Sequence, residues 1–428
     1  MANLDPYDEL PYRSRPIEWT APERLALASM LHGGPRGARE NYRVLELGCA
    51  DGANLLPLAF HRRHSTFVGV DGALTQISIA DANRSLLRLS NVEFIHADFL
   101  TAEARLEGRF DYIIAHGVFS WVPEAARDAL LRLCSARLRD GGLLYLNYNS
   151  NPGWKVRGMI RDFLLAHTES ITGLRRRAES AREVSTTIVA SLSDNDHPYS
   201  RLIADEFRFV AGCDLSYIAH EYLAVDNRPY WRAEFIQLVE RYGLEFVADA
   251  DFNYPSGRVP ENLGQRLTEE RISGFAEADT VDFLCYRQLH SPILAKGPVE
   301  RRPPNVDEFA CLTVASCLAP CEQSIDGMPM FRHPSGYTVE AKNQVIKRVF
   351  DLLAKQWPDG LRIDTVFSDL DEVVPDLTLL FRNGLIDLRL PASISSDVDY
   401  ESLRRFENDK RGHFTTPYHT QVNVVECT

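Results

Sequence analysis

The chain has few cysteines for its length and no long apolar run. Its eight cysteines are spread over 428 residues, which excludes the dense disulfide framework of a small secreted domain. No stretch approaches the roughly 18 consecutive apolar residues of a membrane helix. The first residues, MANLDPYDEL, also lack the basic start and apolar core of a secretory signal. These absences predict a globular, cytoplasmic protein without a membrane partner.

Basic residues are outnumbered by acidic ones. There are 47 Lys plus Arg against 60 Asp plus Glu, which gives a net charge of −13. Such a charge repels phosphate backbones at long range. The segment 301–428 alone carries 14 basic and 19 acidic residues, whereas a domain that reads DNA usually presents a basic stripe. No nucleic-acid partner is therefore expected.

The densest group of potential metal ligands lies late in the chain. It comprises Cys311, Cys317 and Cys321, with His333 beyond them. Their spacings are wider than the C-x2-C pattern of zinc sites. We interpret the three cysteines as ordinary thiols and expect no metal.

Short β-rich runs alternate with helix-like stretches in the first third of the chain. A helix over 22–32 precedes the first run. The runs cover 43–47, 66–70, 92–95, 111–115 and 143–148, with helix-like stretches such as 73–89 and 124–138 between them. This rhythm predicts an α/β fold with a doubly wound, mostly parallel, Rossmann-like sheet.

The pattern changes after this sheet and divides the chain into three parts. Residues 155–222 read as helical and charge-rich. After them, the pattern predicts a helix over 233–243 and a strand over 244–252. We therefore expect residues 233–297 to complete the sheet. A proline-rich stretch at 292–304 predicts a linker. The tail resembles a winged helix, because it reads as a helix over 340–356, an apolar stretch over 362–381 and a strand over 384–390. The predicted domains are 1–154, 155–300 and 301–428.

The strongest local motif is VLELGCADGANLLPLA at 44–59, which reads as a strand, a tight turn and a helix. Gly48 and Gly52 let the backbone approach a ligand closely, and Glu46 at the strand tip offers an acceptor to an amine or a hydroxyl. The turn is not the G-x-G-x-x-G of dinucleotide sites. Asp51 would also repel a pyrophosphate. A nucleotide-like ligand without phosphates fits better.

Acidic residues follow the next two strands. Asp71 lies about 20 residues beyond the turn, where a carboxylate can accept both ribose hydroxyls. Asp98 and Phe99 stand where the edge and face of an adenine would lie. Taken alone, the glycine turn could be an ordinary packing turn, and each aspartate could be a cap. In order along the chain, the features favour an adenosyl cofactor.

Several stretches resemble one known family. They are YDELPY at 7–12, LELGCADGANLLPLA at 45–59, GVD at 69–71, DYIIAHGVFSWVP at 111–123, YNSNPGW at 148–154 and AHEYL at 219–223. The chain resembles bacterial class I methyltransferases with a methyltransferase regulatory domain, including the rickettsial protein-lysine methyltransferases that modify outer-membrane proteins. The resemblance spans nearly the whole chain. It implies an N-terminal domain for S-adenosyl-L-methionine, a helical middle region and a C-terminal winged-helix-like domain.

The resemblance also implies which residues form the site. Residues 116–121 and Tyr148 are expected to line the active-site mouth. The cofactor contacts expected from it are Tyr7, Glu46, Gly48, Cys49, Ala50, Gly52, Asn54, Asp71, Gln76, Asp98, Phe99 and His116.

The predicted reaction is N-methylation of a lysine amine on a protein or peptide. A lysine with a free pKa of ~10.4 must first lose a proton, which costs ~4–5 kcal/mol at neutral pH. The candidate catalytic residues are Tyr148, His220 and Glu221 as proton acceptors, with Trp121 as an aromatic wall. Tyr222 and Trp231 could join that wall or simply pack in the core.

Two other functions stay open at this point. The helical region could close a cap over the sheet, as expected of an enzyme that methylates N or O atoms of small molecules or natural products. Alternatively, the winged helix could bind DNA or a protein, with the cofactor as a signal. An open acidic groove would favour a protein substrate, and a closed apolar pocket a small molecule. A homodimer is possible.

Overall fold

A computed structural model describes residues 6–251 except 13, and residues 277–391 with gaps at 303, 326–327, 334–337, 342–343, 358, 368–369 and 383. It also describes the short strands β16 (His413–Thr415) and β17 (Gln421–Asn423). Residue 252 of the predicted strand, residue 303 of the predicted linker and residues 342–343 of the predicted tail helix lie outside this description.

The centre of the molecule is a seven-stranded sheet in the order β3-β2-β1-β4-β5-β9-β7. Strands β1 to β5 pair in parallel, and β9 is antiparallel to both of its neighbours. The predicted Rossmann-like α/β fold is therefore confirmed, as a mixed sheet. The strands are β1 (Arg43–Leu47), β2 (Thr66–Asp71), β3 (Val92–His96), β4 (Phe110–Ala115), β5 (Leu138–Leu146), β7 (Leu244–Asp249) and β9 (Pro292–Lys296).

Strand β9 corrects part of the predicted linker. Residues 292–296 form an inner strand between β5 and β7, with Ile293, Leu294 and Ala295 fully buried. Pro292 is tolerated because it is the first residue of the strand. The chain leaves the sheet only after this strand.

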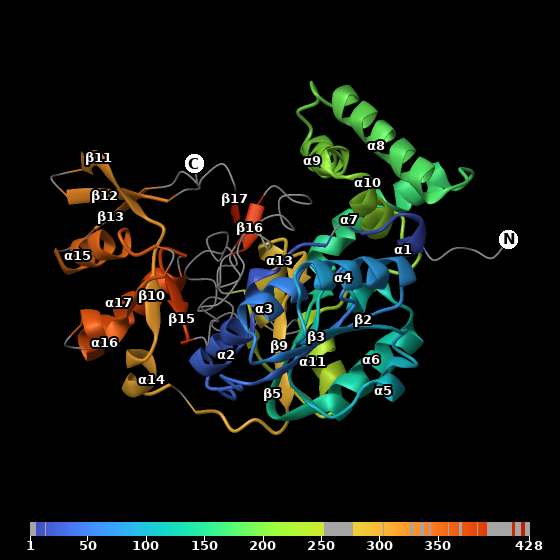
Figure 1. Cartoon of the computed structure of the whole chain (residues 1–428). Helices are drawn as coiled ribbons and strands as arrows, with labels where there is room; N and C mark the ends of the chain where they lie inside the picture. The colour runs from blue at the N-terminus through green and yellow to red at the C-terminus, as the bar shows by residue number, and fades with distance from the viewer. Residues whose placement is uncertain are drawn as a thin grey trace.

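Helices cover both faces of the sheet (Figure 1). The larger core packs α2 (Pro22–Leu31), α3 (Leu55–His61) and α4 (Leu74–Leu86) against one face. The other core holds α5 (Ala102–Arg105), α6 (Glu124–Arg137) and α11 (Arg232–Glu240). Because the carboxyl ends of β1, β2 and β4 meet at one edge, the polar residues that follow them are brought together there.

A helical region stands beyond this edge of the sheet, with α8 and α9 projecting at the top of the view (Figure 1). It has its own core, which includes Leu164, Phe207 and Tyr222. The short helix α1 (Pro6–Glu9) lies against both α4 and α8. The region consists of α7 (Asn151–Thr168), α8 (Leu174–Ser191), α9 (Pro198–Gly212), α10 (Leu215–Tyr217) and the π-helix η3 (Ile218–Tyr222).

The C-terminal part lies to one side, beyond α2 (Figure 1). Its predicted helix is observed as α15 and its predicted strand as β15. The Arg36 guanidinium binds the Glu308 carboxylate at 2.7 Å, and Arg24 pairs with Asp387, so this part is fixed to the N-terminal domain. Its elements are α14 (Val306–Ala310), β10 (Thr313–Ala315), β11 (Ala319–Ile325), β12 (Met328–Arg332), β13 (Thr338–Glu340), α15 (Gln344–Leu353), β14 (Leu361–Arg362), α16 (Ile363–Val366), α17 (Leu370–Arg382) and β15 (Asp387–Arg389).

Across the residues that the structure describes, no helix has both the length and the apolar character needed to cross a bilayer. Helix α13 (Glu277–Leu284) contacts both α7 and α11.

Candidate active site

The turn after β1 requires its glycines. Gly48 and Gly52 have φ angles of 76° and 77°, a region that residues with a side chain rarely adopt. A Cβ on Gly48 would lie 2.3 Å from Val118 Cγ2, and one on Gly52 would lie 2.8 Å from Phe94 Cζ. The backbone N–H groups of Gly48 and Cys49 both donate to the Val70 carbonyl. This ties the turn to the end of β2.

Glu46 places a buried carboxylate just before this turn. Its side chain is only 4% exposed, and Oε1 accepts from Asn54 Nδ2 at 2.8 Å. Oε2 has no partner among the described residues. Burial raises the pKa of Glu46 to about 8. An unsatisfied buried acceptor costs free energy, so a donor such as an ammonium group fits this position.

Asp71 connects the tip of β2 to the glycine turn. Its Oδ2 accepts from the Ala50 backbone N–H at 2.9 Å, and its Oδ1 accepts from the Ala73 N–H at 2.9 Å. Each carboxylate oxygen has a second lone pair. Asp71 can therefore hold the turn and still accept from ligand hydroxyls.

Asp98 and Phe99 follow β3 at the same edge. Asp98 is exposed, and its carboxylate accepts from the Thr101 N–H at 2.8 Å and from the Thr101 hydroxyl at 2.6 Å. These hydrogen bonds lower its pKa. Phe99 is half-buried against the core beside α5. Both stand at the predicted edge, and Asp98 closes the turn that leads into α5.

An N-terminal strap, residues 14–20, crosses the glycine turn. The Ser14 hydroxyl donates to the Asp51 carboxylate, and the Ile17 N–H donates to Asn54 Oδ1 at 2.8 Å. Just before the strap, Gln76 Nε2 donates to the Tyr12 carbonyl at 3.1 Å. Asn54 and Gln76 were predicted as cofactor contacts, and here both also hold the chain that leads over the turn. The sequence carried no local signal for the strap itself.

His220 and Tyr7, predicted separately, lie together. Their rings stack with centroids 4.1 Å apart. His220 is 4% exposed, and its Nε2 lies 2.6 Å from the Leu10 carbonyl oxygen. A carbonyl only accepts, so Nε2 carries the proton and donates it. Nε2 therefore holds the N-terminal segment, so only Nδ1 could serve as the predicted proton acceptor.

Glu221 is the stronger acceptor candidate. It is half-buried in the π-helix η3, a distortion that is frequent at functional sites. Burial raises its pKa to about 7, although the nearby positive charge of Arg157 opposes this shift. The hydroxyls of Tyr12 and Tyr217 are close enough to sense its charge. Tyr222, by contrast, is fully buried in the helical core, as core packing predicts.

The loop after β4 carries the remaining predicted residues. His116 follows the strand directly, and Trp121 packs edge-on against Trp154 with centroids 5.2 Å apart. Burial, and then the charge of Arg15, lower the pKa of His116 to about 4. His116 is therefore a neutral imidazole at physiological pH.

Two protein-family models match parts of the chain. A model described as "Methyltransferase domain" matches residues 45–144, and one described as "Predicted methyltransferase regulatory domain" matches residues 214–296. The chain is 30% identical to the uncharacterized protein RP028 of Rickettsia prowazekii (strain Madrid E) over 55% of this chain and 94% of that protein. The chain belongs to the class I S-adenosylmethionine-dependent methyltransferases with a regulatory domain.

The methyltransferase is also similar to a second protein of known sequence and to one solved structure. It is 33% identical to the uncharacterized protein RP789 of the same organism over 70% of this chain, and it spans about half of RP789, 54%. The solved structure of PKMT2 from Rickettsia typhi in complex with AdoHcy has a TM-score of 0.79 at 22% identity, covering 97% of this chain and 86% of that one. That likeness shows a shared fold.

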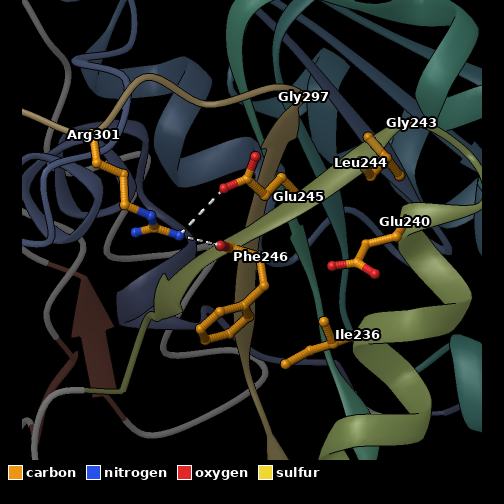
Figure 2. A pocket seen from close by; sticks show the side chains of 8 residues that line it. All are labelled: Ile236, Glu240, Gly243, Leu244, Glu245, Phe246, Gly297 and Arg301. Carbon is orange, nitrogen blue, oxygen red and sulfur yellow. Dashed lines mark hydrogen bonds and ion pairs between the residues drawn. The ribbon is translucent and has the colours of Figure 1, made fainter.

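The methyltransferase has a separate cavity of about 360 Å³ beside the edge strand β7. Figure 2 shows its lining, in which the Arg301 guanidinium reaches the Phe246 carbonyl oxygen (2.7 Å) and the Glu245 carboxylate (3.6 Å). Strand β7 runs parallel to β5, because both are antiparallel to β9. Gly243 and Leu244 therefore lie at the opposite end of the sheet from Gly48. The cavity is not part of the candidate active site.

Cys311, Cys317, Cys321 and His333 form no metal-binding group in the methyltransferase. Within the described ranges, no cluster of three or more His, Cys, Asp or Glu side chains could hold a metal ion. Among the described residues the three cysteines form no disulfide, and all three are half-buried.

The structure corrects the prediction for Tyr148. This side chain is 2% exposed, and its ring stacks on Phe235 with centroids 3.9 Å apart. His290 stacks beside it at 5.2 Å. Tyr148 thus belongs to the core under α11 and does not line the mouth of the site.

This correction predicts different results for two substitutions. Tyr148→Phe should keep methyl transfer within about threefold of wild type, because the packed ring is retained. Tyr148→Ala should lower the free energy of unfolding by ~3–5 kcal/mol. Steady-state kinetics and denaturant unfolding measure the two effects. A loss of more than about a hundredfold for Tyr148→Phe, the scale of a lost general base, would restore a catalytic role.

Proposed function

We propose that this methyltransferase transfers a methyl group to a lysine amine of a protein or peptide. The observation that carries the proposal is Glu221, a half-buried carboxylate on a π-helix beside two tyrosines. It belongs to the segment matched by the regulatory domain. A carboxylate among aromatic rings suits a cationic amine. PKMT2, whose fold this chain shares, supports the choice of acceptor.

The residues at the sheet edge fit the cofactor. The free Oε2 of Glu46 would accept from the ammonium group, and Asp71 would accept from the ribose hydroxyls. Asp98 and Phe99 would meet the adenine. Gly48 and Gly52 let the turn pack against Val118 and Phe94, where any Cβ would clash. When bound, S-adenosylmethionine supplies a methyl group on a sulfonium, which a nucleophile displaces.

The protein's main task is then to deliver a neutral amine. Losing the lysine proton costs ~4–5 kcal/mol at neutral pH. A partly buried site lowers the amine's pKa, and a nearby carboxylate can accept the proton. Glu221 has a pKa of about 7, so it can alternate between its two protonation states near neutral pH. Trp121 and Trp154 would form part of the wall.

We also propose that the chain has three domains, with limits at 1–154, 155–300 and 301–428. The third of these is proposed to be winged-helix-like. Strand β10 pairs antiparallel with β14 and β15, and α16 and α17 precede β15. The acidic excess of this part favours a protein contact over DNA. The cytoplasmic location and the homodimer stay predictions from the sequence.

The test of this function is a labelling experiment. Purified enzyme is incubated with radiolabelled S-adenosylmethionine and fractionated lysate, and labelled protein is hydrolysed to amino acids. We expect the label in macromolecules and, after hydrolysis, in N-methylated lysine. The Asp71→Ala variant serves as the background control. Label that appears only in small metabolites would remove the protein-lysine proposal and favour the small-molecule alternative.

A further inference from the structure

The protonation of His116 is fixed by the groups around its Nδ1 atom. The Gly117 backbone N–H, which can only donate, lies 2.6 Å from Asn147 Oδ1. This contact orients the Asn147 amide, so its Nδ2 donates toward His116 Nδ1 at 3.1 Å. Nδ1 must therefore accept. In a neutral imidazole the proton is then on Nε2.

A second chain of contacts is compatible with the same state. Trp19 Nε1–H, also only a donor, lies 3.0 Å from the Tyr145 hydroxyl oxygen. That hydroxyl lies 2.9 Å from His116 Nδ1 and 3.3 Å from the Ser291 hydroxyl. Tyr145 accepts from Trp19 and has one proton, which its hydroxyl can donate either to His116 Nδ1 or to the Ser291 hydroxyl. The N-terminal strap thus reaches His116 through one buried tyrosine.

The other ring nitrogen is available. His116 is half-buried, and no hydrogen-bond partner for its Nε2 occurs in the part of the chain that the structure describes. It follows β4 at the edge that holds Gly48, since β4 and β1 are parallel neighbours. A fixed N–H donor is therefore presented near the glycine turn.

Arg15 adds a positive charge to the same place. Its neighbours in the strap are bound to the turn, Ser14 to Asp51 and Ile17 to Asn54. The Arg15 side chain is exposed, and its charge reaches both His116 and Tyr12. Among the side chains described, no carboxylate forms an ion pair with it. A guanidinium and an N–H donor together are suited to an anion, in particular a carboxylate.

We propose that His116, through Nε2–H, and Arg15 bind the carboxylate at the amino-acid end of S-adenosylmethionine. This inference rests on the proposed cofactor site. It gives separate partners to the ammonium group and the carboxylate of S-adenosylmethionine. Glu46 accepts from the ammonium group, and the His116 and Arg15 pair donates to the carboxylate. His116 is then a binding residue and not the base of the reaction. Asn147, Tyr145 and Trp19 are positioning residues that keep the proton on Nε2.

The test compares two ligands by calorimetry, S-adenosylhomocysteine and its decarboxylated analogue, which keeps the amine. His116→Phe should weaken S-adenosylhomocysteine by about 10- to 100-fold, the range for a hydrogen bond to a charged group. The analogue should bind wild type and variant within about twofold, because neither complex contains that hydrogen bond. Arg15→Gln should show the same selectivity. His116→Gln, which retains an amide N–H, should recover part of the affinity.

Two further measurements separate this role from a structural one. In wild type, ¹⁵N NMR of the imidazole should show the Nε2–H tautomer, and Asn147→Asp, which replaces the donor with an acceptor, should abolish that pattern. Ser291→Ala is the matched control, because it contacts Tyr145 but not His116. It should leave both the tautomer and the affinity unchanged.

The outcomes distinguish the two proposals. If wild type does not bind S-adenosylhomocysteine at all, the cofactor site itself is wrong. If wild type binds it and His116→Phe weakens both ligands equally, the carboxylate assignment is overturned while the proposed function stands. An Nδ1–H tautomer in wild type would also overturn it.

Discussion

Replacing Asp71 by alanine is expected to weaken binding of S-adenosylhomocysteine by about 100-fold or more. Each hydrogen bond between a carboxylate and a ribose hydroxyl is worth ~1.5–3 kcal/mol when one partner is charged, and two would be lost. The substitution also removes the hydrogen bond that the Ala50 N–H donates to the Asp71 carboxylate at 2.9 Å. The turn and the ribose site are therefore weakened together. Isothermal calorimetry measures the effect directly.

The controls for this prediction lie on the same domain. Asp81→Ala removes an equal charge from the surface of α4, where Asp81 pairs with Arg84 and is 45% exposed. Its affinity should stay within about twofold of wild type, as expected for an exposed pair. Asp71→Asn should be intermediate, because the amide keeps one acceptor oxygen. Unchanged affinity in Asp71→Ala would mean that the ribose lies elsewhere.

The sequence predicts those strands of the sheet whose burial produces a short apolar run between two turns. Strands β1 to β4 are short apolar runs between turns, and the observed bounds differ from the predicted ones by at most one residue. Strand β9 was not separated from the linker, because its five residues begin with a proline and adjoin a proline-rich stretch. Its place between β5 and β7 depends on pairing with residues far away in the chain. Nothing in the local sequence encodes that pairing.

The candidate site shows the same division. The glycine turn with Glu46 and Asp71 was predicted because each residue stands at the tip of an identifiable strand. The contact between Trp19 and Tyr145 joins residues 126 positions apart, so no motif could indicate it. Tyr148 was misplaced because side chains alternate along an extended chain. Its neighbour Asn147 faces His116, which turns Tyr148 toward the opposite core.

Replacing Glu221 by glutamine is expected to lower the rate of the proposed lysine methylation by about 100-fold, the lower range for a lost general base. In wild type, Glu221 must be ionised to accept the proton, and its pKa is about 7. The rate should therefore rise with pH through about 7. The glutamine variant should lack this rise. A pH profile of kcat/KM from 5.5 to 9 measures both effects.

The same carboxylate allows a loss of activity to be distinguished from a loss of fold. Its pKa is raised from 4.5 to about 7 in the folded state, so folding favours the protonated form and stability falls as pH rises between these values. Glu221→Gln should thus melt at the same temperature as wild type or higher at pH 8. Glu183→Gln, at an exposed position of α8, should change neither property. A variant with lower activity and undiminished stability identifies Glu221 as a group kept for the reaction at a cost to the fold, whereas full activity would assign proton removal to solvent.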